Sequence, residues 1–203
     1  MDRERRLESL LEHVRFEKLT SLLPYCLKSA DSTQDFLSAE IKSEREGDFV
    51  ITEIQLQGRG REGRKWHSDL GGLYLSIMLR PELPPIVDRL SLMCANAVLE
   101  TLVKDYGLTG CKIKEPNDVI CNGKKISGIL VDATIKSKAT IACIGMGVNV
   151  NNGSEWSHEM ATIATSYRRE TGKSLDMDRF VVALLKRVDI EYAALSSLLP
   201  RTG

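Results

Sequence analysis

Hydrophobic spacing along the chain alternates between short strand-like runs and helix-like runs. Residues 49–55 and 73–79 are rich in apolar and β-branched side chains and predict two strands. The glycine- and arginine-rich stretch between them follows neither period and is predicted to be a loop. Residues 86–106 follow a helical period and are apolar nearly all round, so this helix is predicted to lie in the core.

Helical spacing also marks both ends of the chain. Leu7, Leu10, Leu11 and Val14 recur at i, i+3, i+4 and i+7, which predicts an amphipathic helix over residues 3–20. Other helices are predicted over residues 33–45, 160–171 and 176–198. The first of these three has N-cap side chains just before it at residues 31–33.

A hairpin is predicted in the middle of the chain, where Asn122-Gly123 separates two β-rich runs and favours a type I′ turn. Lys125 follows the turn, and Gly128 interrupts the returning strand, which predicts a bulge or a close backbone contact there. Residues 25–27 and 140–150 predict further strands. Because strands and helices do not alternate strictly, we predict an α+β fold with a mixed, largely antiparallel sheet and flanking helices.

Charge and composition narrow the classes of function. Lys+Arg and Asp+Glu are balanced at 28 each among 203 residues, which argues against a general nucleic-acid coat. The sequence has no apolar run near 18 residues and no signal-peptide core at its start, so we expect a cytoplasmic protein without a membrane partner. The five cysteines are widely spaced and the three histidines scattered, so we expect no disulfide framework and no metal site.

The loop at residues 58–66 reads GRGREGRKW and concentrates three arginines, a lysine and a tryptophan among three glycines. Arginine forks suit carboxylate and phosphate oxygens, and glycines allow a ligand to approach the backbone. Joining a carboxylate to the α-phosphate of ATP brings anions together against roughly 4 kcal/mol at about 4 Å. These arginines and a nearby strand lysine, Lys125, could offset much of that repulsion. The loop does not match a Walker phosphate cradle.

Five stretches together resemble the biotin–protein ligases, from about residue 31 to residue 195. The loop at 58–66 is similar to the biotinyl-adenylate loop of that family, and KEPND at 114–118 resembles its K-W-P-N-D segment. KISGIL at 125–130 is similar to its K-x-x-G-I-L strand, and GMGVNVN at 145–151 to its G-x-G-x-N-V-N element. DSTQ at 31–34 resembles its S-T-N helix start.

The resemblance implies a fold like that of biotin synthetases and class II aminoacyl-tRNA synthetases. It implies activation of biotin by MgATP to biotinyl-5′-AMP, then transfer to a lysine of a biotin carboxyl carrier domain. Implied catalytic residues are Lys125, Arg61, Arg59 and Asp118. Implied biotin contacts are Ser32, Thr33, Gln34, Gln55, Gly58, Arg59, Gly60, Arg61, Lys125 and Gly128. Implied nucleotide contacts are Arg61, Arg64, Trp66, Asn117, Lys125 and Asn149. A homodimer is expected by analogy only.

The sequence departs from the family pattern in three places. Glu115 stands where the family has a tryptophan, and Gln34 where it has an asparagine. The chain stops at Gly203 without the small C-terminal β-domain usual in the family, so we expect weaker binding of ATP or the carrier. We divide the chain into an N-terminal helical extension, residues 1–24, and a catalytic domain, residues 25–203. The extension is too short for a DNA-binding domain, so no DNA partner is expected.

Two alternatives stay open at this point. A lipoate or octanoate ligase or transferase shares the fold and the acyl-transfer logic. A non-catalytic biotin-binding protein is the other, because Glu115 could have removed the activity. Preferential binding of lipoate is the observation that favours the first. Absence of biotin-dependent pyrophosphate exchange favours the second.

Overall fold

The computed structural model describes residues 2–40, 45–81, 87–136 and 139–198. Within them, a sheet has the strand order β1-β2-β3-β7-β6-β5-β4. Only the β1–β2 pair is parallel among these neighbours. The predicted α+β fold with a mixed, largely antiparallel sheet is therefore confirmed. The strands are β1 (Pro24–Ala30), β2 (Phe49–Gln55), β3 (Leu73–Leu79), β4 (Cys111–Lys114), β5 (Asp118–Cys121), β6 (Lys124–Lys136) and β7 (Ala139–Val148).

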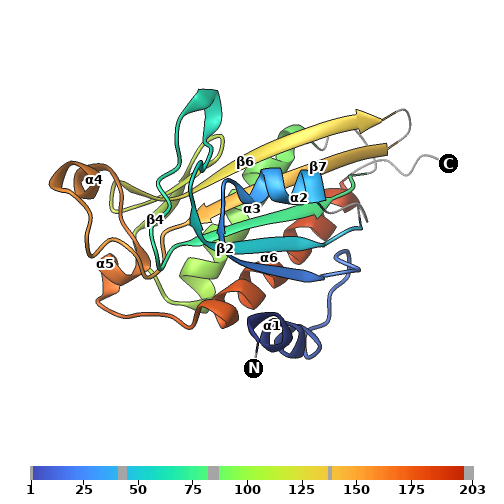
Figure 1. Cartoon of the computed structure of the whole chain (residues 1–203), viewed down its shortest axis with the longest axis horizontal. Coiled ribbons are helices and arrows are strands. Elements are labelled where there is room, and N and C mark those ends of the chain that lie inside the picture. Colours follow the sequence, from blue (N-terminus) through green and yellow to red (C-terminus); the bar gives the residue numbers. More distant parts are fainter. Residues whose placement is uncertain (1, 41–44, 82–86, 137–138, 199–203) are drawn as a thin grey trace.

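Helices cover the two faces of this sheet unequally (Figure 1). The long helices α3 (Val87–Glu100) and α6 (Met177–Ser197) pack together, and α3 also contacts β6 and β7. Their side of the sheet holds the main hydrophobic core. The short helix α2 (Thr33–Glu40) packs on β2, β3 and β7 over a smaller cluster that includes Leu37 and Val50. Because α2 is short, it leaves the rest of its face of the sheet available for a site.

The first helix is shorter than its periodicity predicts. Helix α1 spans Arg3–Leu11 rather than residues 3–20. The reason lies in α6, where Asp189 accepts the backbone N–H groups of residues 17, 18 and 19 at 2.7–3.0 Å. Donors bound to that carboxylate cannot continue a helical ladder. Helix α1 nevertheless shares the main core through Leu7 and Leu11, and its Arg3 and Arg6 both pair with Asp178 of α6.

The other predicted helices differ from the structure mainly at their ends. Helix α2 begins as expected, and residues 41–44 of its predicted span lie outside the described residues. Helix α3 continues as a π-helical turn, Thr101–Asp105, within the span predicted as one helix. The helix predicted over residues 160–171 is two, α4 (His158–Ile163) and α5 (Tyr167–Thr171). Between them the chain bonds to β6 instead, where the Thr165 N–H donates to the Lys125 carbonyl at 2.9 Å.

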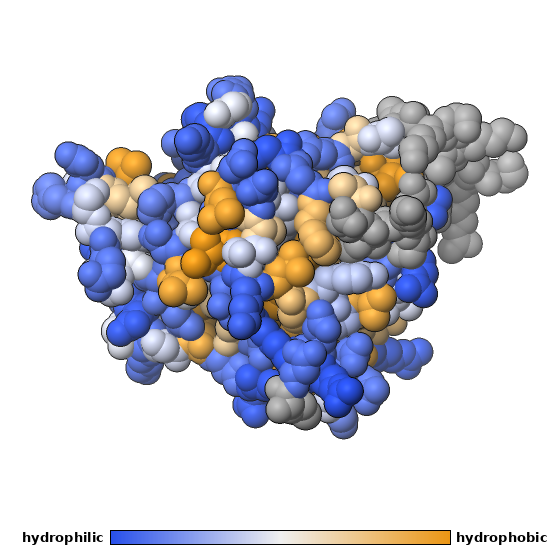
Figure 2. Space-filling view, viewed as in Figure 1, coloured by the Kyte–Doolittle hydropathy of each residue, from blue (hydrophilic) through white to orange (hydrophobic). Residues whose placement is uncertain are grey.

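The predicted hairpin is present between β5 and β6. Asn122 and Gly123 have φ angles of 49° and 82°, as both central residues of a type I′ turn require. The outer surface on the side viewed in Figure 2 is mostly hydrophilic, with a discontinuous strip of apolar residues across its middle. No helix among the described residues is long and apolar enough to cross a membrane.

Candidate active site

Residues that share the α2 face of the sheet line up in rows, because side chains alternate along each strand and the register joins them. One row runs through Tyr74, Gly147, Gly128 and Asp118 on β3, β7, β6 and β5. Gly147 and Gly128 are paired across β7 and β6 in the middle of this row. They leave a flat area of backbone, which we call the glycine strip. A large flat side chain or a ligand can therefore lie directly on the sheet there.

The next row on the same face runs through Ser76, Gly145 and Leu130, under the start of α2. Thr33 accepts a hydrogen bond from Ser76 Oγ at 2.8 Å. Gln34 extends its amide towards the carbonyl of Leu130 at 3.2 Å, and a side chain at Gly145 would collide with it. These contacts fix the beginning of α2 on the sheet, beside the glycine strip.

A shift in register brings Lys125 to this face. Val119 pairs with Ser127, but the next residue, Ile120, pairs with Lys125, so β6 carries one extra residue at Ile126. Without that bulge, strand alternation would turn Lys125 away from Gly128, because the two are an odd number of residues apart. The bulge had been predicted at Gly128, and the structure places it two residues earlier. The predicted close contact at Gly128 is present, because an added Cβ would lie 3.0 Å from Lys125 Nζ.

Lys125 has two partners beside the glycine strip. Its Nζ lies 2.7 Å from Asp118 Oδ1 and 5.2 Å from the centroid of the Trp66 ring. The lysine and aspartate side chains are 36% and 21% exposed, so the pair is reachable from solvent and partly desolvated. In this setting the cation interacts more strongly with a nearby anion than it would in open water.

Residues 58–66, which we call the flap, have more internal order than the sequence suggested. The sequence predicted only a loop with neither helical nor strand period there. The Trp66 N–H in fact donates to the Gly58 carbonyl at 2.8 Å, and the Gly60 N–H donates to the Arg64 carbonyl at 2.7 Å. Arg59 and Lys65 form an antiparallel bridge between these bonds, and a 3₁₀ turn, Arg61–Gly63, closes the tip. The flap therefore has the form of a short hairpin.

The flap closes onto the sheet through Trp66. Its indole lies on the glycine strip, so close that an added Cβ at Gly147 would be 2.5 Å from Cε2 and one at Gly128 2.9 Å from Cζ3. Among the described residues none accepts a hydrogen bond from its buried Nε1. An unpaired buried donor costs about 1–3 kcal/mol, so the buried Nε1 reduces the stability of the tryptophan in this position.

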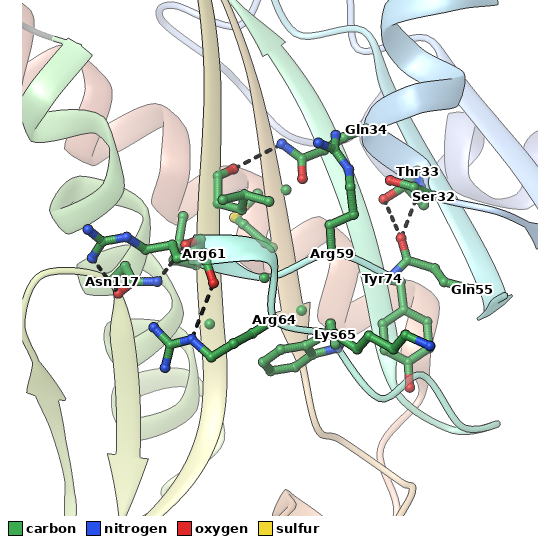
Figure 3. A pocket seen from close by; sticks show the side chains of 18 of the residues that line it. Ser32, Thr33, Gln34, Gln55, Arg59, Arg61, Arg64, Lys65, Tyr74 and Asn117 are labelled. Atoms are coloured by element: carbon green, nitrogen blue, oxygen red, sulfur yellow. Dashed lines mark hydrogen bonds between the residues drawn. The ribbon is translucent and has the colours of Figure 1, made fainter. Parts of the chain in front are cut away.

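The flap arginines point to different parts of the site (Figure 3). Arg59 reaches up beside Gln34 and forms ion pairs with acids of α2 and β6. Arg61 extends the other way and donates to Asn117 Oδ1 at 3.3 Å. Arg64 turns back to the Arg61 carbonyl at 3.2 Å. The three arginine side chains therefore do not meet at one position in this structure.

A chain of hydrogen bonds joins α2 to the base of the flap. Gln55 Oε1 accepts from the Thr33 N–H at 2.9 Å and from Thr33 Oγ1 at 3.1 Å, and its Nε2 donates to Ser68 Oγ at 3.1 Å. Ser32, beside it, is 3% exposed. Hydroxyl and amide groups therefore gather at one end of the site, while Arg61 and Arg64 lie towards the other (Figure 3).

The cavity between flap and sheet has a volume of about 140 Å³, below the roughly 300–1,000 Å³ of most ligand pockets. Burial and the nearby Asp69 raise the pKa of Tyr74 at its edge, so this phenol stays protonated. Predicted site residues that line the cavity are Ser32, Thr33, Gln34, Gln55, Arg59, Gly60, Arg61, Arg64, Trp66, Asn117, Asp118, Lys125 and Gly128.

Two predicted site residues do not line the cavity as the structure describes it. Gly58 contributes its carbonyl to the flap ladder, and Asn149 is buried with its amide oxygen bonded to Asn152. Sequence reasoning missed Tyr74, Gly145 and Gly147, which do line it. The G-x-G spacing on a strand was the available signal for the two glycines. Among the described residues no group of three or more His, Cys, Asp or Glu could hold a metal ion.

Comparison of the sequence with known proteins identifies its relatives. A sequence model of the biotin/lipoate A/B protein ligase family matches residues 26–149. The bifunctional ligase/repressor BirA of Bacillus spizizenii is 38% identical over 135 residues, covering 64% of this chain and 41% of that protein. The biotin–[acetyl-CoA-carboxylase] ligase of Paracoccus denitrificans is 32% identical over 138 residues, 66% of this chain and 58% of that protein. The chain thus spans less than two thirds of these relatives.

Comparison with solved structures extends the match. The biotin protein ligase of Aquifex aeolicus, solved in complex with biotin and ATP, superimposes with a TM-score of 0.75 at 34% identity. That match covers 86% of this chain and 72% of the other. The sequence model alone spans more than half of the chain. The chain described here therefore belongs to the biotin/lipoate A/B protein ligase family.

Proposed function

We propose that this chain activates biotin with ATP to biotinyl-5′-AMP and transfers the biotinyl group to a lysine of a biotin carboxyl carrier domain. The observation that carries the proposal is the position of Lys125, a cation beside the glycine strip and under the arginine-bearing flap. Relatives named as biotin ligases, and a related structure that holds biotin and ATP, support it.

The first step forms a bond between a biotin carboxylate oxygen and the α-phosphorus of ATP, and the bond to pyrophosphate breaks. Both reactants are anions, so the step needs positive charge rather than a proton acceptor. Lys125 and Arg61 would supply that charge near the α-phosphate. The nucleotide would enter as MgATP, and its metal ion is carried as part of the substrate.

The second step is attack of the carrier lysine amine on the biotinyl carbonyl, with AMP as the leaving group and loss of one amine proton. Asp118 pairs with Lys125 and would orient the amine or accept that proton. The flap would cover the mixed anhydride until the carrier arrives, because exposure to water leads to hydrolysis. Trp66 would form the apolar part of that cover.

The polar end of the cavity favours biotin over lipoate. The ureido ring of biotin carries two N–H donors and a carbonyl acceptor, and Ser32, Thr33 and Gln55 offer hydroxyl and amide partners for them. The dithiolane ring of lipoate makes no strong hydrogen bonds, so it would leave buried polar groups unpaired at about 1–3 kcal/mol each. A lipoate or octanoate ligase is therefore the second candidate.

Biotin-dependent exchange of labelled pyrophosphate into ATP tests activation by itself, and mass spectrometry of a carrier domain tests transfer. We expect both with biotin, and at least tenfold lower exchange with lipoate or octanoate. Lys125→Ala serves as the inactive control. Exchange that prefers lipoate would select the second candidate. Biotin binding without any exchange at saturating ATP would leave a binding protein.

The division of the chain and its setting are proposed on the same basis. Residues 25–203 would form the catalytic unit, and residues 1–24 would support it by packing of α1 on α6. The carrier domain is the protein partner that the chemistry requires. We propose the cytoplasm as the compartment, which requires biotin, ATP and the carrier domain to be present there together.

A further inference from the structure

Arg59 is held by two carboxylates that belong to different elements. Its Nη2 lies 2.8 Å from Asp35 Oδ1 on α2 and 2.8 Å from Asp132 Oδ2 on β6. Gln34 Nε2 also approaches Asp132 Oδ2, at 3.3 Å. Asp132 pairs with Cys143 across the sheet, on the same face as the glycine strip. The guanidinium thus joins the flap to α2 and to the sheet at the rim of the cavity.

The position of the flap depends on the contacts that it makes with the rest of the protein, because its internal hydrogen bonds do not attach it to the sheet. The bonds between residues 58 and 66, and between 60 and 64, lie within the flap, so they would be retained if the flap lifted as one hairpin. What breaks on lifting is its side-chain attachment to the body. That attachment includes the Arg59 ion pairs, the weak Arg61–Asn117 bond and the seat of Trp66.

Lifting of the flap would make room for a ligand. The closed cavity, at about 140 Å³, is smaller than the space that a bicyclic acid or a nucleotide needs. In the closed flap, Trp66 Nε1 is also a buried donor without an acceptor among the described residues, which is unfavourable. The ion pairs at Arg59 therefore stabilise the closed position and oppose the cost of the unpaired donor.

We propose that Asp35 and Asp132 are positioning residues that hold Arg59 and thereby latch the flap closed. Both act from the rim, while the cavity itself is lined by other residues. Gln34 steadies Asp132. Position 34, where the family has asparagine, thereby has a role in flap closure. The longer glutamine side chain spans from α2 to β6. The proposal deepens the proposed function but the latch itself does not depend on which ligand binds.

The strength of the latch follows from its exposure. The side chains of Arg59, Asp35 and Asp132 are 41%, 57% and 44% exposed. Exposed ion pairs are weak and are screened by salt, with a Debye length of about 3 Å at 1 M. We therefore expect loss of one carboxylate to raise the open population about threefold, and loss of both about tenfold at low salt.

Limited trypsin digestion tests the latch without any ligand, because the flap contains four trypsin sites, at Arg59, Arg61, Arg64 and Lys65. The variants are Asp35→Asn, Asp132→Asn and the double variant, with mass spectrometry to assign each cut. We expect cleavage within the flap to rise about threefold in each single variant and about tenfold in the double variant at 50 mM salt. At 1 M salt the difference from wild type should disappear.

Controls separate a latch from a loss of fold. Glu53→Gln removes an exposed carboxylate of β2 and should leave flap cleavage unchanged, and Asp132→Glu should restore protection. Cleavage outside the flap should stay at the wild-type rate in every variant. Wild-type flap cleavage in the double variant, or a rise spread equally over the whole chain, overturns the proposal.

A second measurement uses biotin and rests on the proposed function. Biotin should dissociate about tenfold faster from the double variant, while the maximal rate of pyrophosphate exchange changes less than about twofold. Tighter biotin binding by the double variant would mean that the acids hold Arg59 away from the ligand, and it overturns the latch. If wild type binds no biotin, the proposed function fails, and the trypsin experiment still decides on the latch.

Discussion

The seat of Trp66 predicts that a single methyl group on the sheet will displace the flap. In Gly147→Ala the new Cβ would lie 2.5 Å from Cε2 and 2.7 Å from Nε1 of Trp66. Non-bonded carbon atoms pack at about 3.5–4.0 Å, so one partner must move by about 1 Å. Gly147 lies on β7 between β3 and β6, where paired strands resist movement. The indole therefore has to move.

The size of the effect follows from what the indole loses. Overpacking costs about 1–3 kcal/mol, and the cation–π contact with Lys125, 5.2 Å from the ring centroid, contributes about 0.5–2 kcal/mol. The flap can relieve the clash by lifting, so the cost appears as an open flap and the core stays folded. We expect biotin affinity to fall about tenfold, which corresponds to about 1.4 kcal/mol.

Two assays measure this displacement. Biotin affinity is measured by isothermal titration calorimetry, and the environment of Trp66 by tryptophan emission with Trp156 replaced by phenylalanine. Gly147→Ala should shift the emission to longer wavelength. Gly145→Ala is the matched control on the same strand and face, because its added methyl meets Gln34 rather than Trp66. It should shift the emission less than Gly147→Ala does, because it reaches the flap only through Gln34 and the Asp132–Arg59 pair.

A double-mutant cycle decides whether Trp66 mediates the whole effect. If it does, Gly147→Ala adds no loss of affinity once Trp66→Ala is present. Additive losses would show that the methyl group acts on the ligand or the sheet directly. Unchanged emission together with unchanged affinity in Gly147→Ala would refute the reasoning from the glycine strip altogether.

Three further predictions concern other parts of the molecule. Lys125→Ala should keep the fold, checked by circular dichroism, and lower biotin-dependent pyrophosphate exchange about 100-fold or more, because it removes charge at the reacting phosphate. Arg61→Ala loses the bond to Asn117 and should release biotinyl-AMP several-fold faster in a single-turnover trap experiment, whereas unchanged release would remove Arg61 from adenylate retention. Burial alone would raise the pKa of Asp189, but backbone N–H groups of residues 17–19 lower it below its ordinary 3.8. The ionised Asp189 therefore stabilises the folded state above pH 3.8, and this stabilisation is lost as the pH falls through the lowered pKa. Asp189→Asn should cost about 1–3 kcal/mol at pH 7 by urea unfolding and flatten the acid limb, and equal stability of the two proteins at pH 7 would contradict this.

Local pattern predicted the elements that have a strong local sequence signal. Strands β2 and β3 end at the residues that their β-rich runs indicate, and Asn122-Gly123 forms the expected turn. The limits of these features are marked by neighbouring residues, so periodicity and turn chemistry suffice to place them, although the strands are held by pairing with distant segments. The helix predicted over residues 3–20 failed because its second half is bound by a carboxylate of α6. No local pattern reports a partner so distant in the chain.

The composition of the site was also readable from the sequence, since most of the residues predicted for it line one cavity. Its geometry was not. Strand alternation by itself places Lys125 and Gly128 on opposite faces, and only the extra residue at Ile126 brings them together. The bulge arises from pairing between β5 and β6, and the seat of Trp66 from two glycines on neighbouring strands.

The sequence by itself therefore determined which chemical groups this protein has and which elements carry them. The tertiary structure decided which way those groups face and what holds them, as with the two acids at Arg59. The physical reason is that propensity and periodicity act over a few residues. Register and side-chain pairing depend on contacts between segments that the chain order keeps far apart.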